Sequence, residues 1–303
     1  MGREQDERRR TKKAPRPPLT SGDRAAAAIT IAGLDPSGGA GIAADLRAFR
    51  AAGVWGASVC AVLTVQSTKG LAEAHAVPAK VVRASAVACL VDLDVRAMKS
   101  GALGSEENVR AVAELFAECK DIPTIVDPVM APSRALSAGA RLDGSASDDA
   151  LWALVRAATL VTPNADEASA LLGRTVRTEA EARGAAEDLV RSGARAVLVK
   201  GGHVEGGAQA IDWFATAKGV VPIARKRVAT PPLHGTGCTL SALIAGRLAS
   251  RGKRGAASEE EMLAAIRWAR GALDRALRAP IAVGGGGRVL DVRQPGSLRE
   301  PLK

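Results

Sequence analysis

The residues best suited to chemistry lie in the segment His234-Gly-Thr-Gly-Cys-Thr239, which leads directly into an apolar stretch that predicts a helix. Glycines at a helix start expose unpaired backbone N–H groups, and together with the helix dipole these groups form an anion site. Gly235, Thr236 and Gly237 would therefore stabilise the oxygens of a phosphoryl group in transfer. Cys238, in the first turn, is predicted to have a lowered thiol pKa and to act as a general base. The alternative is a buried structural cysteine.

Polar residues also follow three predicted strands, at the position where open α/β sheets bind ligands. Asp127 ends one strand, and its carboxylate would hold a cation or orient a hydroxyl, unless it only forms a turn. Lys200 ends another strand before two glycines, which indicates phosphate contact, with a solvated strand end as the alternative. Asn164 and Glu167 follow a third strand and fit a capping box. As functional residues, they would place Glu167 where it organises the water shell of magnesium near phosphates.

The first predicted strand ends in a glycine-rich loop, residues 33–41, that formally matches a dinucleotide-binding fingerprint. A dinucleotide site also needs an acidic residue at the end of the second strand, but that strand ends in Val65-Gln66. A neutral amide pairs better with the donor and acceptor positions of a heterocycle, so Gln66 indicates a base-like small molecule. The loop is otherwise explained as a tight turn. The chain holds no G-x-x-x-x-G-K-[ST] motif, which excludes a P-loop NTPase.

The composition of the 303 residues is that of a globular chain, with 47% hydrophobic and 24% charged residues. Aromatic residues make up only 2%, which argues against base-stacking nucleic-acid surfaces and predicts a core of Ala, Val, Leu and Ile. Residues 1–24 hold eight basic and four acidic side chains and so carry +4 of the net charge of +10. We interpret them as a disordered basic tail, with contact to nucleic acid or an anionic surface as the alternative.

The sequence shows neither a signal peptide nor a membrane span, so we expect a cytoplasmic protein without a membrane partner. Its cysteines are scattered without a C-x-x-C pair, which supports neither a disulfide framework nor a zinc knuckle. We interpret Cys60, Cys89 and Cys119 as structural residues.

From Ala26 onward, short β-rich runs alternate with helical stretches, which predicts an α/β fold with a mostly parallel sheet covered on both faces. The expected strands are 29–32, 58–65, 95–98, 124–126, 160–161 and 196–199. The expected helices between them are 42–52, 78–90, 105–118, 148–157, 166–172 and 179–191. An antiparallel hairpin of residues 210–214 and 220–225 is expected at one edge, followed by helices 235–250 and 259–277.

We predict a single domain over residues 25–280. Ser258 followed by Glu261 forms a capping-box pattern at the start of the last helix. The glycine run 284–287 predicts a flexible link within a short C-terminal extension, residues 281–303.

Taken together, these segments resemble the hydroxymethylpyrimidine and phosphomethylpyrimidine kinases of thiamine biosynthesis, members of the ribokinase-like superfamily. The resemblance extends from Ile29 to Arg251, and the order and spacing of its motifs make it specific. The motifs are Ile31-Ala-Gly-Leu-Asp-Pro-Ser-Gly-Gly-Ala-Gly-Ile42, Ala44-Asp-Leu46, Val65-Gln66, Asp127-Pro-Val-Met130, Thr162-Pro-Asn164, Glu167, Val199-Lys-Gly-Gly-His203 and His234-Gly-Thr-Gly-Cys-Thr239.

The resemblance implies a three-layer α/β/α fold, a homodimer, and the use of ATP with Mg²⁺ to phosphorylate first the hydroxymethyl group of the pyrimidine and then its phosphate. The residues that it places in the pyrimidine pocket are Gly33, Asp45, Gln66 and Val129. Those that it assigns to ATP and its phosphates are Asn164, Lys200 and Thr239, with Asp127 and Glu167 at the metal. Cys238 falls where most relatives in the superfamily carry a catalytic aspartate, which motivates the hypothesis that its thiolate deprotonates the attacking hydroxyl.

The chain departs from the family pattern at two places. Ala102 stands where the family usually has Met, which would enlarge or reshape the pocket, and 132–134 replace a common lid motif, with Arg134 as a candidate to cover the phosphates. The nearest alternative function is a pyridoxal kinase of the same superfamily. A catalytically silent pyrimidine sensor is a second alternative, although it would have no need of the whole phosphate apparatus.

Overall fold

The structure, a computed structural model, describes residues 24–130, 142, 146–203, 209–230 and 233–293. Residues 1–23 of the predicted basic tail and the lid candidate Arg134 lie outside the described residues.

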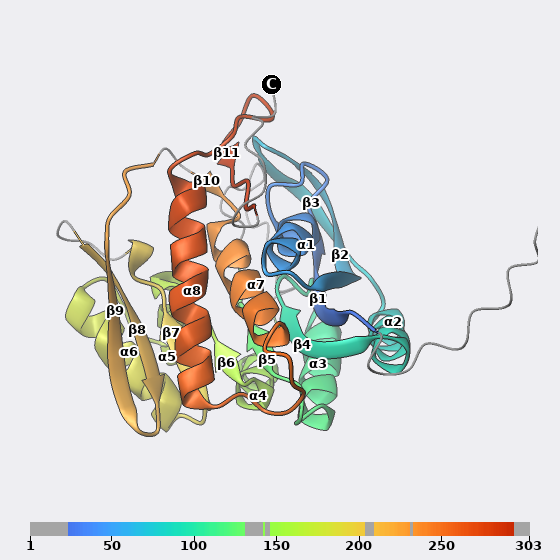
Figure 1. The fold of residues 1–303 in the computed structure, drawn as a ribbon, viewed down its shortest axis with the longest axis horizontal. Helices are drawn as coiled ribbons and strands as arrows, with labels where there is room; N and C mark the ends of the chain where they lie inside the picture. Colours follow the sequence, from blue (N-terminus) through green and yellow to red (C-terminus); the bar gives the residue numbers. More distant parts are fainter. Residues whose placement is uncertain (1–23, 131–141, 143–145, 204–208, 231–232, 294–303) are drawn as a thin grey trace, which may run out of the picture.

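A nine-stranded sheet forms the middle layer of the fold, in the order β3-β2-β1-β4-β5-β6-β7-β8-β9 (Figure 1). The strands are β1 (Ala26–Leu34), β2 (Trp55–Ser67), β3 (Gly70–Ala76), β4 (Asp94–Ser100), β5 (Thr124–Val126), β6 (Leu160–Val161), β7 (Ala196–Val199), β8 (Gln209–Thr216) and β9 (Gly219–Lys226). The strands from β2 to β7 in this order pair in parallel, with Ala27 opposite Trp55 and Ala26 opposite Asp94 in the central pairs. The predicted mostly parallel sheet is confirmed, as is the antiparallel hairpin β8–β9 at one edge.

The opposite edge carries an antiparallel strand that was not predicted. β3 pairs with β2 from Val62 opposite Ala76 to Ser67 opposite Gly70. Its sequence, Gly-Leu-Ala-Glu-Ala-His-Ala, is rich in Ala and Glu, which are poorly represented in strands. The strand therefore forms through pairing with its neighbour, which sequence composition does not reveal.

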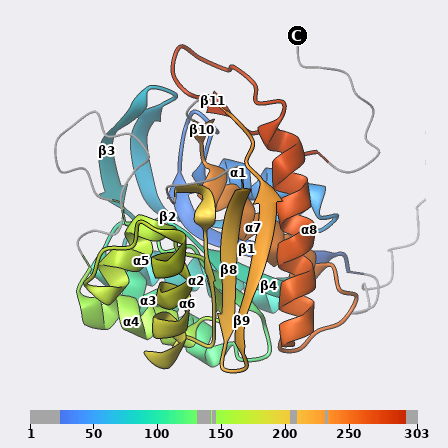
Figure 2. The same cartoon turned by 90° about the vertical axis from the view of Figure 1, so that its left-hand side faces the viewer.

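Helices cover both faces of the sheet (Figures 1 and 2). On one face lie α1 (Gly41–Ala51), α7 (Thr236–Ala249) and α8 (Glu259–Leu277), and on the other lie α2 (Ala79–Asp92), α3 (Glu106–Glu118), α4 (Asp148–Ala157), α5 (Ala165–Leu172) and α6 (Glu179–Arg191). Successive strand residues face opposite layers, so Ile125 belongs to the α1–α7–α8 core and Val126 to the other. Both cores consist mainly of Ala, Val, Leu and Ile, as predicted.

Most helices start at a side chain that accepts a hydrogen bond from the first turn. The capping residues are Ser105 of α3, Ser147 of α4, Asn164 of α5, Thr178 of α6 and Ser258 of α8. The capping boxes expected at Asn164 and Ser258 are both present. By contrast, α7 follows Gly235 and has no side-chain cap, so its N-terminal N–H groups stay available to a ligand.

The segment after α8 returns to the domain instead of extending from it. β11 (Arg288–Val289) pairs in parallel with β10 (Leu233–His234), and Leu290 is buried in the core. The glycine run expected to be a flexible link packs on the turn between β2 and β3, where a Cβ on Gly286 would lie 1.9 Å from the Thr68 carbonyl oxygen. No helix in the described ranges has both the length and the apolar character needed to cross a membrane.

Candidate active site

Lys200, directly after β7, lies at the centre of a buried charge cluster. Its Nζ is 2.8 Å from Oδ1 of Asp127, directly after β5, and 3.5 Å from Oε2 of Glu167 in α5. Burial acts to lower the pKa of Lys200, but Asp127 and Glu167 outweigh it and raise that pKa to about 12. Burial acts to raise the pKa of Asp127, but the ammonium groups of Lys200 and Lys99 hold it below its usual range. The two predicted metal residues, Asp127 and Glu167, thus meet around the predicted phosphate residue Lys200.

Asn164 and Glu167 both cap α5 and contribute to this cluster. The Asn164 N–H donates to Glu167 Oε2 at 2.7 Å, and the Glu167 N–H donates to Asn164 Oδ1 at 2.8 Å. Burial raises the pKa of Glu167 to about 7, opposed by Lys200 and reinforced by Asp127. The Glu167 oxygen that caps α5 also faces Lys200 Nζ. Capping the helix and contributing to the charge cluster are therefore compatible roles for Glu167.

The uncapped N-terminus of α7 adjoins the same cluster. Gly235 precedes the helix with φ +79°, and a Cβ there would lie 2.2 Å from the Gly39 carbonyl oxygen, so only glycine fits. Thr236 is the first helical residue. A Cβ on Gly237 would lie 3.2 Å from Lys200 Nζ and 3.7 Å from Asp127 Oδ2. The predicted anion site therefore adjoins the predicted phosphate and metal residues, with less room between them than a methyl group normally takes.

Cys238 lies in the first turn of α7, partly buried. Burial raises the pKa of its thiol to about 12, and the nearby Asp127 and Asp45 carboxylates add to that rise. Lys99 and the Gly41 N–H favour the thiolate but are outweighed. The prediction that the helix start lowers this pKa is therefore wrong, because burial and the nearby carboxylates have the larger effect.

Thr239, which the resemblance assigns to ATP and its phosphates, lies in the first turn of α7. Its hydroxyl donates to the Gly235 carbonyl at 2.8 Å, and the residue is buried. It therefore stabilises the first turn of α7.

A second buried ion pair joins Asp45 of α1 to Lys99 of β4. Both side chains are 0% exposed, with Lys99 Nζ 2.8 Å from Asp45 Oδ2, and the Thr30 hydroxyl donates to the same oxygen at 2.6 Å. Asp45 Oδ1 is buried without a hydrogen-bond partner among the described residues. Burial raises the pKa of Asp45, with Lys99 opposing, and the Asp45 carboxylate is the largest influence that raises the pKa of Lys99 against burial. Lys99 was not predicted as a site residue.

Gln66, near the end of β2, contacts a histidine that also had no predicted role. Its amide nitrogen Nε2 lies 2.8 Å from His234 Nε2, and that histidine nitrogen lies 2.9 Å from Asp35 Oδ2. Burial acts to raise the pKa of Asp35, but its hydrogen bonds to His234 and Ser37 hold it below its usual range. This contact connects β10 to the glycine-rich loop after β1.

The two remaining residues of the predicted pyrimidine pocket lie at the carboxyl ends of β1 and β5, which are separated in the sheet by β4. A Cβ on Gly33 would lie 2.9 Å from Val62 Cγ1 and 3.5 Å from Ala102 Cβ, so the departure at Ala102 adjoins this glycine. Val129 follows β5, and its N–H donates to the Asp127 carbonyl at 2.8 Å.

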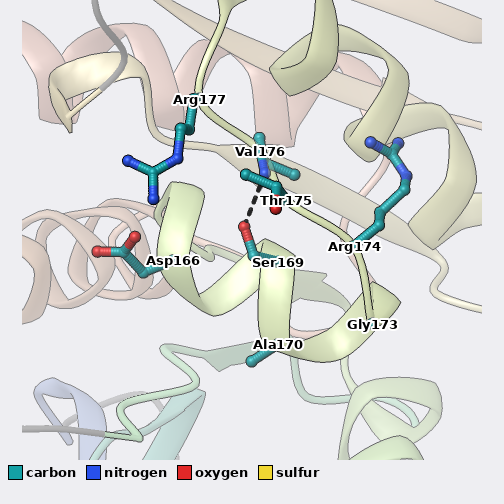
Figure 3. A pocket seen from close by; sticks show the side chains of 8 residues that line it. All are labelled: Asp166, Ser169, Ala170, Gly173, Arg174, Thr175, Val176 and Arg177. Atoms are coloured by element: carbon teal, nitrogen blue, oxygen red, sulfur yellow. Dashed lines mark hydrogen bonds between the residues drawn. The ribbon is translucent and has the colours of Figure 1, made fainter.

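A surface cavity of about 430 Å³ lies elsewhere, between α5 and the segment that follows it (Figure 3). Asp166 and Arg177 point toward each other across it, and Ser169 Oγ accepts from the Val176 N–H at its inner wall. None of the predicted site residues lines this cavity. Within the described ranges, no group of three or more His, Cys, Asp or Glu side chains is arranged to hold a metal without further ligands.

The match to a family model decides the classification of the chain. The model of the phosphomethylpyrimidine kinase family matches residues 35–291. The chain belongs to the phosphomethylpyrimidine kinase family. A hydroxymethylpyrimidine/phosphomethylpyrimidine kinase of Rhizobium meliloti (strain 1021) is 41% identical to it over 262 residues, which cover 86% of this chain and 95% of that protein.

Solved structures agree with membership of this kinase family. Phosphomethylpyrimidine kinase from Clostridium difficile 630 matches with a TM-score of 0.65 and 29% identity, covering 82% of this chain and 98% of that one. Pyridoxal kinase from Bacillus subtilis, solved as an ADP complex, matches with a TM-score of 0.75 and 27% identity, covering 88% and 96%. The predicted family, the ribokinase-like fold and the kinase function in thiamine-precursor phosphorylation are confirmed.

Proposed function

We propose that this member of the family transfers a phosphoryl group from ATP to the hydroxymethyl group of 4-amino-5-hydroxymethyl-2-methylpyrimidine, and then a second one to the monophosphate. The observation that carries this proposal is the uncapped N-terminus of α7 beside the buried Lys200–Asp127–Glu167 cluster. Backbone N–H groups and an ammonium group that meet at one point suit the negative oxygens of a phosphoryl group in transfer. The names of the relatives supply the substrate class.

Asn164 and Lys200 would bind the phosphates of ATP, and Asp127 with Glu167 would hold Mg²⁺. One or two carboxylates, completed by phosphate and water oxygens, form a common magnesium site, so the donor set fits. When bound, Mg²⁺ would neutralise charge on the phosphate oxygens. Lys200 holds both carboxylates in place beforehand, since its Nζ lies within 3.5 Å of each.

The pyrimidine would lie between Gly33, Asp45, Gln66 and Val129. Asp45 Oδ1 supports this placement, because a buried carboxylate oxygen without a partner needs a donor such as an exocyclic amine. The Gln66 amide offers a donor and an acceptor for a ring edge.

Cys238 would accept the proton of the hydroxymethyl group in the first step. Burial holds the pKa of its thiol at about 12, so the thiol is protonated near neutral pH. Proton transfer to Cys238 would therefore require that the bound substrates lower this pKa. The second step needs less from a base, because a phosphate monoester is already an anionic nucleophile near neutral pH.

Pyridoxal phosphorylation is the alternative that one observation favours. Ala102 lies beside Gly33, where a methionine would take up more of the pocket, and the smaller side chain leaves room for a differently substituted ring. The match to a pyridoxal kinase structure is in line with this alternative.

The deciding experiment is ATP consumption, with products identified by mass, on the hydroxymethylpyrimidine, its monophosphate and pyridoxal side by side. We expect formation of the pyrimidine diphosphate. Phosphorylation of pyridoxal alone would indicate a pyridoxal kinase. Tight pyrimidine binding without ATP consumption would indicate a sensor.

A homodimer is proposed from the exposed apolar residues of one edge. Val81, Val87 and Val91 of α2 and Leu63 and Val65 of β2 are all more than a third exposed. Light scattering coupled to size-exclusion chromatography tests it, and a monomeric mass would contradict it. The cytoplasmic location stays a prediction.

A further inference from the structure

The ring of His234 is held in a fixed position between two segments far apart in the sequence. A Cβ on Gly39 would lie 2.7 Å from His234 Cδ2 and 2.9 Å from Val289 Cγ1, so the imidazole and Val289 both pack on this glycine. His234 also pairs with Val289 across the β10–β11 bridge. The backbone and the packing together leave the ring little freedom to turn.

The partner of this ring, Asp35, is equally fixed. Its Oδ1 accepts from the Ser37 N–H at 2.9 Å and the Ser37 hydroxyl at 2.7 Å, and its Oδ2 accepts from the Ala40 N–H at 2.9 Å. These bonds stabilise the charged carboxylate, and the pKa of Asp35 lies below its usual range because they and His234 outweigh burial. Near neutral pH, Asp35 is therefore an acceptor only.

A single nitrogen of His234 faces both Asp35 and Gln66, and this settles which atom of Gln66 it meets. An imidazole nitrogen carries either a proton or a lone pair. A lone pair on Nε2 would face the Asp35 carboxylate at 2.9 Å, which is repulsive, so Nε2 carries the proton. The structure places Gln66 Nε2 2.8 Å from the same nitrogen, which would set an NH₂ group against an N–H group. Exchanging the amide nitrogen and oxygen of Gln66, which have nearly the same shape, removes this clash and presents the carbonyl oxygen to the imidazole.

We propose that His234, held by Asp35, is a positioning residue that fixes the Gln66 amide with its oxygen toward the imidazole and its NH₂ group toward the ligand. Among the described residues, the far end of this amide has no hydrogen-bond partner. The pocket then offers a fixed donor to a ring nitrogen, while the second lone pair of the amide oxygen remains open to an exocyclic amine. This inference rests on the proposed placement of the substrate at Gln66.

The orientation selects between the two candidate substrate classes. When the two rings are superposed on their hydroxymethyl and methyl groups, the aminopyrimidine has an acceptor nitrogen and an amine where pyridoxal has a ring hydroxyl and an aldehyde. A fixed NH₂ donor matches the ring nitrogen, and the neighbouring oxygen matches the amine. Without the contact to His234, the Gln66 amide could rotate so that its oxygen and its NH₂ group exchange places. The preference for the aminopyrimidine over pyridoxal would then fall.

Two substitutions at His234 test this role by kinetics. His234→Leu removes the donor, and we expect the KM for the hydroxymethylpyrimidine to rise about 3- to 10-fold, the worth of one hydrogen bond, with little change in kcat. The ratio of kcat/KM between this pyrimidine and pyridoxal should fall with it. His234→Gln, whose NH₂ group can donate to both Asp35 and Gln66, should restore most of the KM. His75→Leu, an exposed histidine on β3, is the matched control and should change neither.

An unchanged KM and substrate preference in His234→Leu would overturn the proposal. It would also fail if His234→Gln were as impaired as His234→Leu with an equal loss of kcat, because that pattern indicates a purely structural role. Thermal unfolding of each variant shows whether it is folded.

A readout independent of turnover is the tautomer of His234, from long-range ¹H–¹⁵N NMR of the whole chain. The chain has only three histidines, so the spectrum of His234→Gln assigns the resonance. We expect a proton on Nε2, and an unprotonated Nε2 near neutral pH would refute the inference. If the wild type phosphorylates neither ring, the proposed function fails while this spectroscopic result still decides the orientation.

Discussion

Replacing Gly237 by alanine separates the anion site from the stability of α7. Gly237 adopts no positive φ, so its backbone accepts an alanine, and glycine within a helix is less favourable than alanine by about 0.5–1 kcal/mol. The new Cβ would lie 3.2 Å from Lys200 Nζ, so this ammonium group must shift by a few tenths of an ångström while it keeps its ion pair with Asp127. The strain of this shift opposes the gain in helix propensity, so the free energy of unfolding should change by no more than about 1 kcal/mol.

The effect on turnover should be large, because the methyl group stands between the α7 N–H groups and Lys200. Loss of one preorganised donor to a developing anion costs about 10²-fold or more in kcat, and we expect a loss of this size. Urea unfolding and the steady-state rate on the hydroxymethylpyrimidine measure the two quantities. The matched control is Gly271→Ala within α8, where a Cβ would meet only Arg275 Nη1 at 3.7 Å, and it should gain similar stability with full activity. A Gly237→Ala enzyme with wild-type kcat would refute the placement of the transferring phosphoryl group.

Four further predictions follow from the contacts of single residues. Cys238→Ala should slow the first phosphorylation by about 10²–10⁴-fold and the second by less; equal losses in single-turnover assays of the two steps would count against a base. Lys99→Met should lower the free energy of unfolding by about 3–5 kcal/mol, because Asp45 stays buried without its partner, and Lys99→Met/Asp45→Asn should regain much of it in urea titrations. Ala102→Met should lower kcat/KM for pyridoxal about tenfold more than for the pyrimidine, and an unchanged ratio would place Ala102 outside the pocket. Hydrogen bonds from Lys253 and the Ser258 N–H lower the pKa of Glu261 from 4.5 to about 2, so its stabilisation is present above pH 4.5 and is lost as pH falls through about 2. Unfolding of Glu261→Gln should therefore differ from wild type at pH 7 and converge with it in acid.

Local patterns predicted most of the fold. The alternation of strand and helix placed every parallel strand within a few residues, and Asn164 and Ser258 cap the helices that their spacing indicated. β3 was not predicted, because its Ala- and Glu-rich sequence becomes a strand only through pairing with β2. The glycine run 284–287 was interpreted as a flexible link for a similar reason, since its fit against Thr68 depends on a turn more than 200 residues earlier.

Polar residues at the ends of predicted strands indicated part of the site, and the same signal marks one further residue of it. A lysine that closes a buried strand singled out Lys200, and the same signal exists at Lys99 near the end of β4. This signal does not identify the residue that pairs with the lysine. Asp45 contacts Lys99 from α1, 54 residues earlier in the chain. Asp127 and Glu167 likewise converge on Lys200 from separate elements.

The pKa of Cys238 shows why such partners decide chemistry. Its position in the first turn of α7 favours the thiolate, and that argument needs the sequence alone. Burial and the carboxylates of Asp127 and Asp45 oppose ionisation, and neither is visible before the chain is folded. Lys99 favours the thiolate, so the pKa of this thiol depends on burial and on three charged groups that are far from Cys238 in the sequence. In the proposed placement, an amine that donates to Asp45 Oδ1 would reduce the repulsion between that carboxylate and a thiolate at Cys238, which would link recognition of the pyrimidine to activation of the base.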